Sequence, residues 1–352
     1  MRRLTKIAAA STVLALALAG CAQSDDETSA ADMCDGGGDG PKVGLAYDVG
    51  GRGDQSFNDS AARGMQKAVD DLDATCTEAE AQDGEAESAR EDRLRALAED
   101  GHNPIIGTGF AYSNAVDAVA PDFPDVSFGV VDGFDPTADE PNDNVAYLGF
   151  AEHEGSFLVG VAAALKTQAD HIGFVGGVHN DLIKKFEAGY VAGAKAVKPD
   201  IKVDVKYIEE EDLAGFADPA GGKAAAAAMY ENGADIVYHA AGGSGSGVFD
   251  AAVEAGDGMW AIGVDSDQYL TASDDAKEHI LTSMLKRVDV ATFNEIKSVD
   301  DGDPLASYQS YDLKADGVGY ATSGGFIDDI TDQIDDYAAK IKSGEITVPD
   351  KP

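Results

Sequence analysis

Polar residues and glycines stand directly after a series of short apolar runs along the sequence. Four of these runs lead to Asp48, Asp132, Asp265 and Lys286. Carboxylates accept hydrogen bonds and an ammonium group donates them, so this set suits a small ligand rich in N–H and O–H groups. Three other runs lead to glycine-containing stretches, where a ligand can approach the backbone closely. These stretches are Gly107-Thr108-Gly109-Phe110, Gly176-Gly177 and Ala240-Ala241-Gly242-Gly243-Ser244-Gly245.

The sequence lacks the residue constellations that make or break covalent bonds. The stretch 243–247 carries glycine where a nucleophile elbow needs serine. The stretch 221–223 lacks the spacing of a phosphate-binding P-loop. The six histidines form no H-x-x-x-H pair, and no EF-hand loop is complete. We therefore expect binding without catalysis, and neither a metal nor a cofactor.

The elements that must position these groups are strands that alternate with helices. This alternation predicts parallel sheets covered on both faces, and the strands are too many for one sheet, so we expect two doubly wound α/β lobes. Ligands bind beyond the carboxyl ends of parallel strands, here in a cleft between the lobes. The predicted strands are 42–47, 104–106, 126–131, 172–175, 236–238, 260–264 and 280–285, and the predicted helices 57–72, 86–99, 111–119, 151–167, 182–196, 222–232, 247–256 and 288–298.

One aromatic residue, Phe57, stands at the mouth of a glycine-rich loop. The loop follows the first strand and leads to a helical repeat of apolar residues. Ser56 and Asp59 have the spacing of a capping box, which predicts that the helix begins at Phe57. A large aromatic ring at the mouth of a loop is unexpected, because such residues are more often found inside a core.

The charge balance restricts the partners. The formal net charge is -39, from 65 acidic and 26 basic residues. Phosphate-rich nucleic acid and anionic lipid surfaces would be repelled, so we expect no nucleic-acid partner.

The N-terminus reads as an export signal. Arg2, Arg3 and Lys6 precede an apolar stretch, 7–19, that is short for a membrane span. Leu18-Ala19-Gly20-Cys21 resembles a bacterial lipobox, which implies a signal peptide over 1–20 and acylation of Cys21. The alternative is an ordinary signal peptide with a chance cysteine. We expect a flexible tether over 21–40 and a lipid-anchored protein that faces away from the cytoplasm.

Two further cysteines, Cys34 and Cys76, remain. An exported protein permits a disulfide, and their even number fits one. The alternative is two free thiols.

Several stretches, taken in order, resemble one known family. They are D-V-G-G-x-x-D-x-S-F-N (48–58), N-V-A-Y-L-G-F-A-E-H-E-G-S-F-L-V-G-V-A-A-A-L (144–165), I-G-F-V-G-G (172–177), F-E-A-G-Y-V-A-G (186–193), H-A-A-G-G-S-G-S-G-V (239–248), I-G-V-D-S-D-Q (262–268) and I-L-T-S-M-L-K-R-V-D (280–289). The chain resembles the basic membrane protein family, the purine-nucleoside-receptor type of ABC transporter substrate-binding lipoprotein, over about residues 42–345.

The resemblance implies a type I periplasmic-binding-protein fold whose two lobes close on a ligand. Lobe 1 is expected to span 41–146 plus about 270–300, and lobe 2 to span 147–269 plus about 301–352. The implied partners are a purine nucleoside, an ABC permease and its ATPase, and the membrane through Cys21. The protein is expected to be monomeric.

The resemblance also implies a set of ligand-binding residues. Phe57 and Phe186 would stack on the two faces of a purine, and such stacking contributes about 1–3 kcal/mol per base. The other implied roles are Asn58 toward ribose or base, Asp132 toward a ring or exocyclic N–H, Asp265 and Lys286 toward the ribose hydroxyls, Gly242 beside the sugar, and Asp48 as a ligand contact or a brace for its loop. The alternative is structural. Phe57 and Phe186 would both be core anchors, with Phe186 in a buried stripe beside Ile183, Tyr190 and Ala194. The polar residues would then serve as caps, turns and salt bridges.

Some positions depart from the family pattern. Arg52 and Gly53 replace an aliphatic residue and Asn, and the stretch 177–181, which includes His179, lacks a proline. These changes bear on base preference. Two other functions are open: binding of a sugar or other small polar ligand, and an intracellular regulator on the same fold, which the export signal and the charge oppose.

Overall fold

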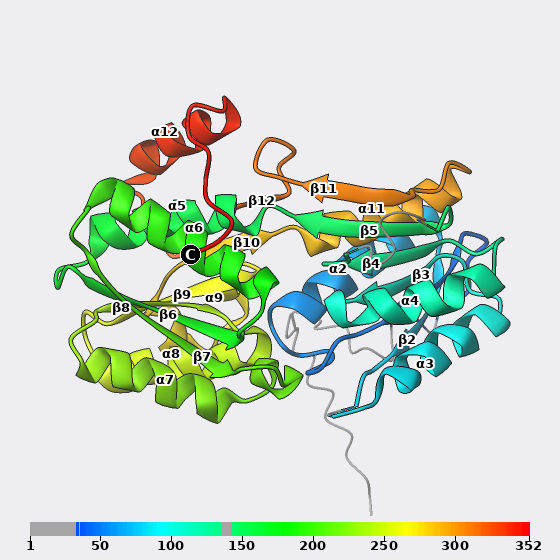
Figure 1. Cartoon of the computed structure of the whole chain (residues 1–352), viewed down its shortest axis with the longest axis horizontal. Coiled ribbons are helices and arrows are strands. Elements are labelled where there is room, and N and C mark those ends of the chain that lie inside the picture. The colour runs from blue at the N-terminus through cyan, green and yellow to red at the C-terminus, as the bar shows by residue number, and fades with distance from the viewer. Residues whose placement is uncertain (1–32, 35, 83, 135–141) are drawn as a thin grey trace, which may run out of the picture.

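The computed structural model of the chain describes residues 33–34, 36–82, 84–134 and 142–352. The predicted signal peptide and Cys21 lie outside the described residues, as does most of the predicted tether. The chain folds into two lobes side by side, each built on one twisted sheet (Figure 1). Two sheets of mostly parallel strands with interleaved helices confirm the predicted α/β fold with two doubly wound lobes.

The first lobe contains a fully parallel sheet of order β11-β5-β4-β3-β1-β2. Its central strands are continuous apolar runs, and β3, β4 and β5 are buried at every position, as expected for strands covered on both faces. The elements of this lobe are β1 (Lys42–Ala46), α2 (Phe57–Leu72), β2 (Thr75–Ala79), α3 (Glu87–Glu99), β3 (Ile105–Thr108), η1 (Phe110–Tyr112), α4 (Ser113–Val119), η2 (Ala120–Asp122), β4 (Phe128–Val131), β5 (Val145–Phe150), α11 (Val288–Asp300) and β11 (Ser307–Tyr311).

The second lobe contains a sheet of order β12-β10-β9-β8-β6-β7, in which only β12 runs antiparallel to its neighbour. Its elements are α5 (Glu152–Lys166), β6 (His171–Val178), α6 (Asp181–Val197), β7 (Lys202–Glu209), η3 (Leu213–Phe216), α7 (Pro219–Glu231), β8 (Ile236–Ala240), η4 (Gly242–Ser244), α8 (Gly245–Ala255), β9 (Trp260–Asp265), α9 (Gln268–Thr271), α10 (Asp274–Lys277), β10 (Ile280–Lys286), β12 (Val318–Tyr320) and α12 (Thr331–Lys342).

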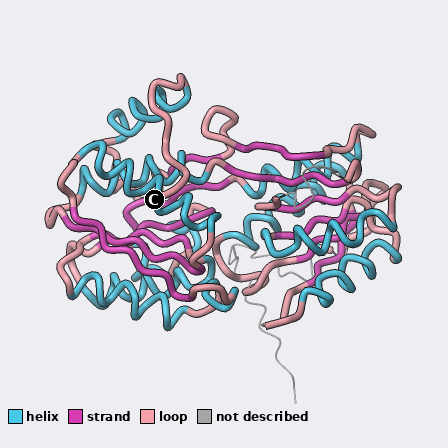
Figure 2. Tube along the Cα trace, in the orientation of Figure 1, coloured by secondary structure: helices cyan, strands magenta, loops and turns pink. Residues whose placement is uncertain are grey.

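Pairs of helices cover the faces of both sheets (Figure 2). In the first lobe α2 packs on α11 and α3 on α4; in the second α5 packs on α6 and α7 on α8. The α5–α6 pair is held close by glycine: a Cβ at Gly189 or Gly193 would collide with the backbone of His153 or Phe157. This close approach fixes α6, which carries Phe186.

The expected lobe boundaries are partly wrong. β10 was expected in lobe 1 but pairs with β9 in the second sheet, and β11 was expected in lobe 2 but pairs with β5 in the first. The strand β5 ends at Phe150, beyond the expected boundary at 146. The chain thus changes lobe after β5, after β10 and after β11. A buried apolar run predicts a strand but not the sheet to which the strand belongs, because the sheet depends on which strand it pairs with.

Two further features concern the predicted disulfide and the lengths of the helices. Cys34 and Cys76 form a disulfide that ties the segment before β1 to β2. Within the described part of the chain, the helices are too short or too polar to cross a membrane.

Candidate ligand-binding site

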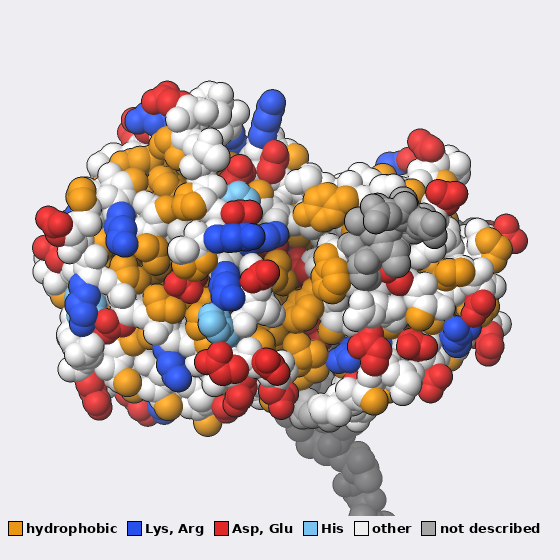
Figure 3. All heavy atoms as spheres, viewed as in Figure 1, with side chains coloured by type: hydrophobic (Ala, Val, Ile, Leu, Met, Phe, Trp, Pro, Cys, Tyr) orange, Lys and Arg blue, Asp and Glu red, His pale blue; other side chains and the backbone are white. Residues whose placement is uncertain are grey.

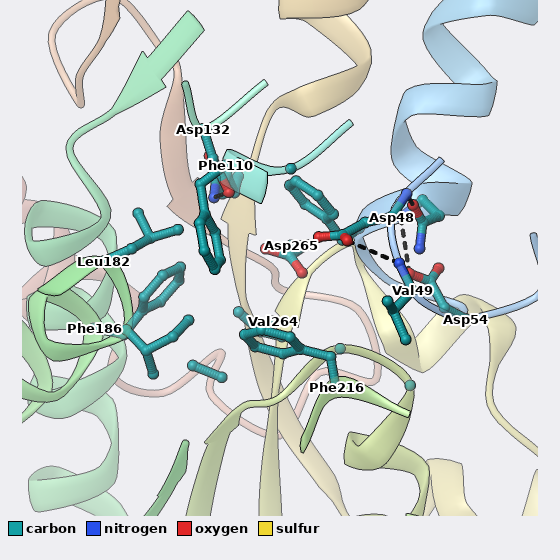
Figure 4. Close-up of a pocket in the computed structure, with 18 residues that line it drawn as sticks. Asp48, Val49, Asp54, Phe110, Asp132, Leu182, Phe186, Phe216, Val264 and Asp265 are labelled. Carbon is teal, nitrogen blue, oxygen red and sulfur yellow. Dashed lines mark hydrogen bonds and ion pairs between the residues drawn. The ribbon is translucent and has the colours of Figure 1, made fainter. Parts of the chain in front are cut away.

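A cavity lies between the lobes, and with the solvent space at its mouth it measures about 550 Å³. Clefts between domains are common places for small-molecule sites. Figure 4 shows the lining side chains of this cavity converging from both lobes. The structure brings all eight residues selected from the sequence into its wall: Asp48, Phe57, Asn58, Asp132, Phe186, Gly242, Asp265 and Lys286. Because parallel strands end at one edge of each sheet, residues far apart in the chain meet here.

Two of the acidic residues occupy equivalent places in the two lobes. Asp132 follows β4 directly and Asp265 ends β9. Both have left-handed backbone conformations, with φ of 61° and 64°. Aspartate is among the few residue types other than glycine that adopt this conformation readily, and at a strand end it turns the chain away sharply. Each carboxylate is thereby buried at the cavity wall.

Lys286 is the buried cation of the site. Its Nζ lies 2.6 Å from Asp132 Oδ2 and 3.4 Å from Glu152 Oε1. Burial alone would lower the pKa of Lys286, but these carboxylates and Asp265 raise it well above its ordinary value. The charge of Lys286 also lowers the pKa of Asp265, so Lys286 partly offsets that carboxylate as well, although its direct ion pairs are with Asp132 and Glu152.

A second lysine extends this ion-pair chain. Lys185 Nζ lies 3.2 Å from the second oxygen of Glu152, so positive and negative groups alternate along it. Burial raises the pKa of Asp132, and the charge of Lys286 opposes that shift. Asp132 Oδ1 has no hydrogen-bond partner among the described residues. That oxygen is therefore an acceptor available to an N–H group of a ligand.

Asp265 is held by the opposite lobe. Ser56 Oγ donates to Asp265 Oδ2 over 2.7 Å and also approaches the carbonyl of Val264 at 3.2 Å. Burial raises the pKa of Asp265 to about 6, while Lys286 and the Ser56 hydrogen bond oppose the rise. Asp265 is therefore mainly ionised at neutral pH and can accept from hydroxyl groups.

The expected capping box at the start of α2 is wrong, although the helix does begin at Phe57. Because Ser56 Oγ points to the other lobe, it makes no cap hydrogen bond. Asp54 takes its place and accepts from the backbone N–H groups of Ser56, Asn58 and Asp59 at 2.9, 2.8 and 3.1 Å. A carboxylate at a helix N-terminus also meets the positive end of the helix dipole.

The loop before α2 is braced from within. The backbone N–H of Asp48 donates to Asn58 Oδ1 over 3.0 Å, and Val49 N–H donates to Asp48 Oδ1 over 2.8 Å. The carbonyl oxygen of Asn58 is thus engaged in the loop. Burial raises the pKa of Asp48 to about 6, with the Val49 hydrogen bond and Arg90 opposing. Gly109, at φ 103°, leaves room for Asp48 Oδ2, because a Cβ there would collide with it.

The aromatic residues surround the ammonium group of Lys286. Its Nζ lies 5.1 Å from the ring centroid of Phe57 in the first lobe and 5.4 Å from that of Phe186 in the second. A third ring, Phe150, lies at 5.1 Å. Distances under about 6 Å are typical of cation–π contacts. Phe57 is half-buried, whereas Phe186 is almost fully buried and also packs in the core with Ile183, Tyr190 and Ala194.

Several lining residues were not selected from the sequence. Phe110 follows β3 and could have been found, because it ends one of the glycine-containing stretches at a strand end. Phe216 gave no such signal, since it ends the short η3 after β7, a strand without an apolar run. Figure 4 shows both rings directed into the cavity. The additional lining residues are Val49, Asp54, Gly109, Phe110, Leu182, Ile183, Phe216, Ala240, Gly243 and Val264.

Arg52 and His179 lie outside this wall. Arg52 Nη1 binds Glu78 over 2.8 Å, and its Nε lies 3.7 Å from Asp59, so it ties the loop to β2 and α2. His179 is exposed, with Nδ1 3.0 Å from Glu210 Oε2. Gly242 has a left-handed φ of 54°, and a Cβ would lie 3.3 Å from the carbonyl oxygen of Phe216. Its backbone conformation therefore favours glycine independently of any ligand.

Comparison with known proteins agrees with this architecture. Residues 42–352 match the family described as ABC transporter substrate-binding protein PnrA-like. The chain belongs to this family. It is 34% identical to the CD4+ T-cell-stimulating antigen of Listeria innocua over 100% of both chains, and 36% identical to the ABC transporter nucleoside-binding protein BmpA of Lactococcus lactis over 99% of both.

A solved solute-binding protein of an ABC transporter system from Aeropyrum pernix has a TM-score of 0.75 and 28% identity, over 88% of this chain and 94% of that one. As a member of this family, the chain is an extracytoplasmic substrate-binding protein and not an enzyme. It takes a small molecule and works with the permease and ATPase of an ABC transporter.

Proposed function

We propose that this family member binds purine nucleosides by aromatic stacking and lobe closure. The observation that carries the proposal is that Phe57 of one lobe and Phe186 of the other line one cavity around the Asp132–Lys286 ion pair. A flat heterocycle between such rings gains about 1–3 kcal/mol from stacking. The name of the Lactococcus lactis relative supports a nucleoside as the ligand class.

The polar groups divide between base and sugar. The free oxygen Asp132 Oδ1 suits an N–H group of the base, and Asn58 lines the same cavity. Asp265 and Lys286 supply an acceptor and a donor for the ribose hydroxyls. The wall carries Asp48, Asp54, Asp132 and Asp265 against Lys286 alone, so a phosphate group would meet a net negative surface. We therefore expect nucleosides to bind and nucleotides to bind poorly.

A panel of purine nucleosides, free bases, nucleotides and sugars in a thermal-shift assay tests the ligand class. A cognate nucleoside at a hundredfold excess over Kd should stabilise the protein by about 2.7 kcal/mol. A sugar can use the same acids and stack on the same rings, so it is the competing ligand. Stabilisation by sugars with none by nucleosides would replace the proposal with a sugar-binding function.

The variants Phe57→Ala and Asp265→Ala test the site by calorimetry. Loss of the Phe57 ring should weaken nucleoside binding at least about tenfold, since 1.4 kcal/mol corresponds to that factor. Asp265→Ala should remove the preference for a nucleoside over its free base. Phe293→Ala is the matched control, because this half-buried ring of lobe 1 lies outside the cavity wall. Unchanged affinities in both site variants would refute the assignment.

We further propose that the protein is monomeric and anchored through acylated Cys21. Several acyl chains on one residue would hold it firmly at a membrane, since each buried CH₂ contributes about 0.8 kcal/mol. Metabolic labelling with a fatty acid should mark the wild-type protein, and Cys21→Ala should lose the label and the membrane fraction. A wild-type protein without label would contradict the anchor while leaving the ligand proposal intact.

A further inference from the structure

A second, larger hollow of about 1200 Å³ adjoins the ligand cavity. Phe110, Asp132 and Leu182 line both spaces, so these three side chains form the partition between them. Figure 4 shows Phe110 and Leu182 extending toward one another from opposite lobes. We call this space the outer groove; its other lining residues are Gly133, Phe134, Gly149, Phe150, Glu152, Asn180, Asp181, Lys185, Tyr308, Asp350 and Lys351.

Two exposed aromatic side chains line the outer groove. Phe134 and Tyr308 are 49% and 54% exposed. The other large hydrophobic residues exposed in the described part of the chain, Val205 and Leu270, lie outside the groove. Exposed apolar groups that gather at one concave place indicate a binding surface, whereas isolated ones need no explanation. Figure 3 shows hydrophobic side chains on both sides of the hollow between the lobes.

Both rings are held by the first lobe. The backbone N–H of Phe134 donates to Ser113 Oγ over 3.1 Å, and Tyr308 belongs to β11 and packs over Gly149. Both rings are therefore presented to the groove by the first lobe.

Polar groups stand on the inner wall of the same groove. Glu152 and Asp132 are almost fully buried, and Lys185 pairs with Glu152 at 3.2 Å. The groove carries the acids Asp132, Glu152, Asp181 and Asp350 against the lysines 185 and 351, so it favours a neutral ligand with hydrogen-bonding edges over an anion. Its chemistry thus resembles that of the inner cavity.

We propose that the outer groove is a capture subsite, where the same neutral heterocyclic ligand first stacks on Phe134 and Tyr308 before it passes Phe110 and Leu182. This inference rests on the proposed nucleoside-binding function and adds an entry step to it. Capture is fast and weak, and closure of the lobes follows it. The observed association rate is therefore the fraction of protein with ligand in the outer groove multiplied by the rate at which that ligand moves into the inner cavity.

Stopped-flow binding of a purine nucleoside to the variants Phe134→Ala and Tyr308→Ala tests the subsite. Each substitution should lower the association and dissociation rate constants alike, about fivefold, which corresponds to about 1 kcal/mol of lost stacking in the captured state. Kd should stay unchanged, because neither ring lines the inner cavity where the ligand finally rests. Tyr308→Phe keeps the ring and should retain the wild-type rate. Leu270 is an exposed hydrophobic residue outside the groove wall, so Leu270→Ala is the matched control and should have no effect.

The outcomes separate this inference from the proposed function. Wild-type binding of nucleosides with unchanged association rates in both variants overturns the capture subsite alone. If the two variants lose transporter-dependent uptake but keep the wild-type binding rates, the capture subsite is also overturned. Phe134 and Tyr308 would then contact a protein and not the ligand. Absence of nucleoside binding by the wild-type protein overturns both.

Discussion

At the scale of single residues, the cavity places ionisable groups where water is scarce. Asp48 and Asp265 have pKa values raised to about 6 by burial, against an ordinary value of 3.8. A carboxyl group with a raised pKa in the folded state contributes stability that is fully present below pH 3.8 and is lost as the pH rises through 6. At neutral pH these ionised groups therefore cost folding free energy and are retained as hydrogen-bond acceptors.

Asp265→Asn tests this trade between stability and binding. The amide cannot ionise but can still accept from Ser56. Denaturant unfolding at pH 7.5 should show a free energy of unfolding higher by up to about 3 kcal/mol, with little difference near pH 4. Nucleoside affinity should fall at the same time. The raised pKa predicts that the gain in free energy of unfolding of the variant over the wild type is larger at pH 7.5 than at pH 4. A gain that is smaller at pH 7.5 than at pH 4 would contradict it.

Lys286→Met tests the buried ion pairs. Its removal leaves Asp132 and Glu152 without the buried cation that contacts both, and breaking such a cluster costs about 3–5 kcal/mol. Denaturant unfolding at pH 8 should show this loss, and the double variant Lys286→Met/Asp132→Asn should recover part of it. Full wild-type stability of the single variant at pH 8 would show that the cluster contributes nothing.

At the scale of elements, hydrogen bonds join the start of α2 to the end of β9 across the lobes. Ser266 Oγ donates to the carbonyl of Ser56 over 2.7 Å and accepts from Arg63 Nη2 over 2.7 Å. Ser56 and Arg63 belong to the first lobe and Ser266 to the second, outside the cavity wall. These bonds stabilise the arrangement in which the two lobes meet.

Ser266→Ala should weaken every ligand by the same factor, about fivefold, because it removes about 1 kcal/mol from the closed form without touching the ligand. Calorimetry with a nucleoside and its free base measures both affinities. Ser246→Ala is the control, since its hydroxyl bonds Gly243 within one lobe. Unchanged affinities would mean that the Ser266 bonds persist when the lobes open.

At the scale of the whole molecule, charge governs stability and solubility. A net charge of -39 makes the compact state repel itself, and salt screens this repulsion over about 10 Å at 0.1 M and 3 Å at 1 M. Differential scanning fluorimetry should show a melting temperature that rises between 0.05 and 1 M NaCl, with KCl giving the same curve. Nucleoside affinity should change less than about twofold, since the ligand is neutral. A melting temperature that falls with salt would contradict this account.

Much of the architecture could be predicted because central strands are continuous apolar runs in the sequence, and polar residues or glycines mark where these strands end. Runs such as Phe128–Val131 are buried on both faces, so they contain apolar residues alone. Parallel strands then place the residues after their carboxyl ends at one edge, which is why Asp48, Asp132 and Asp265 lie in one wall. The family motifs added Phe57 and Phe186, which no local periodicity separates from core residues.

The edge strands and the pairing partners were decided only by the tertiary structure. The strands β2, β7, β11 and β12, none of which the apolar pattern predicts, are the edges of the two sheets. An edge strand faces solvent, so its sequence needs no continuous apolar run.

The ion pair between Asp132 and Lys286 spans 154 residues, and the hydrogen bond from Ser56 to Asp265 spans 209. The sequence by itself determined which groups stand at strand ends. The packing of the two sheets decided which of these groups touch. It also decided that Ser56 joins the lobes instead of capping α2. Interactions between neighbours in the chain cannot encode contacts over such separations.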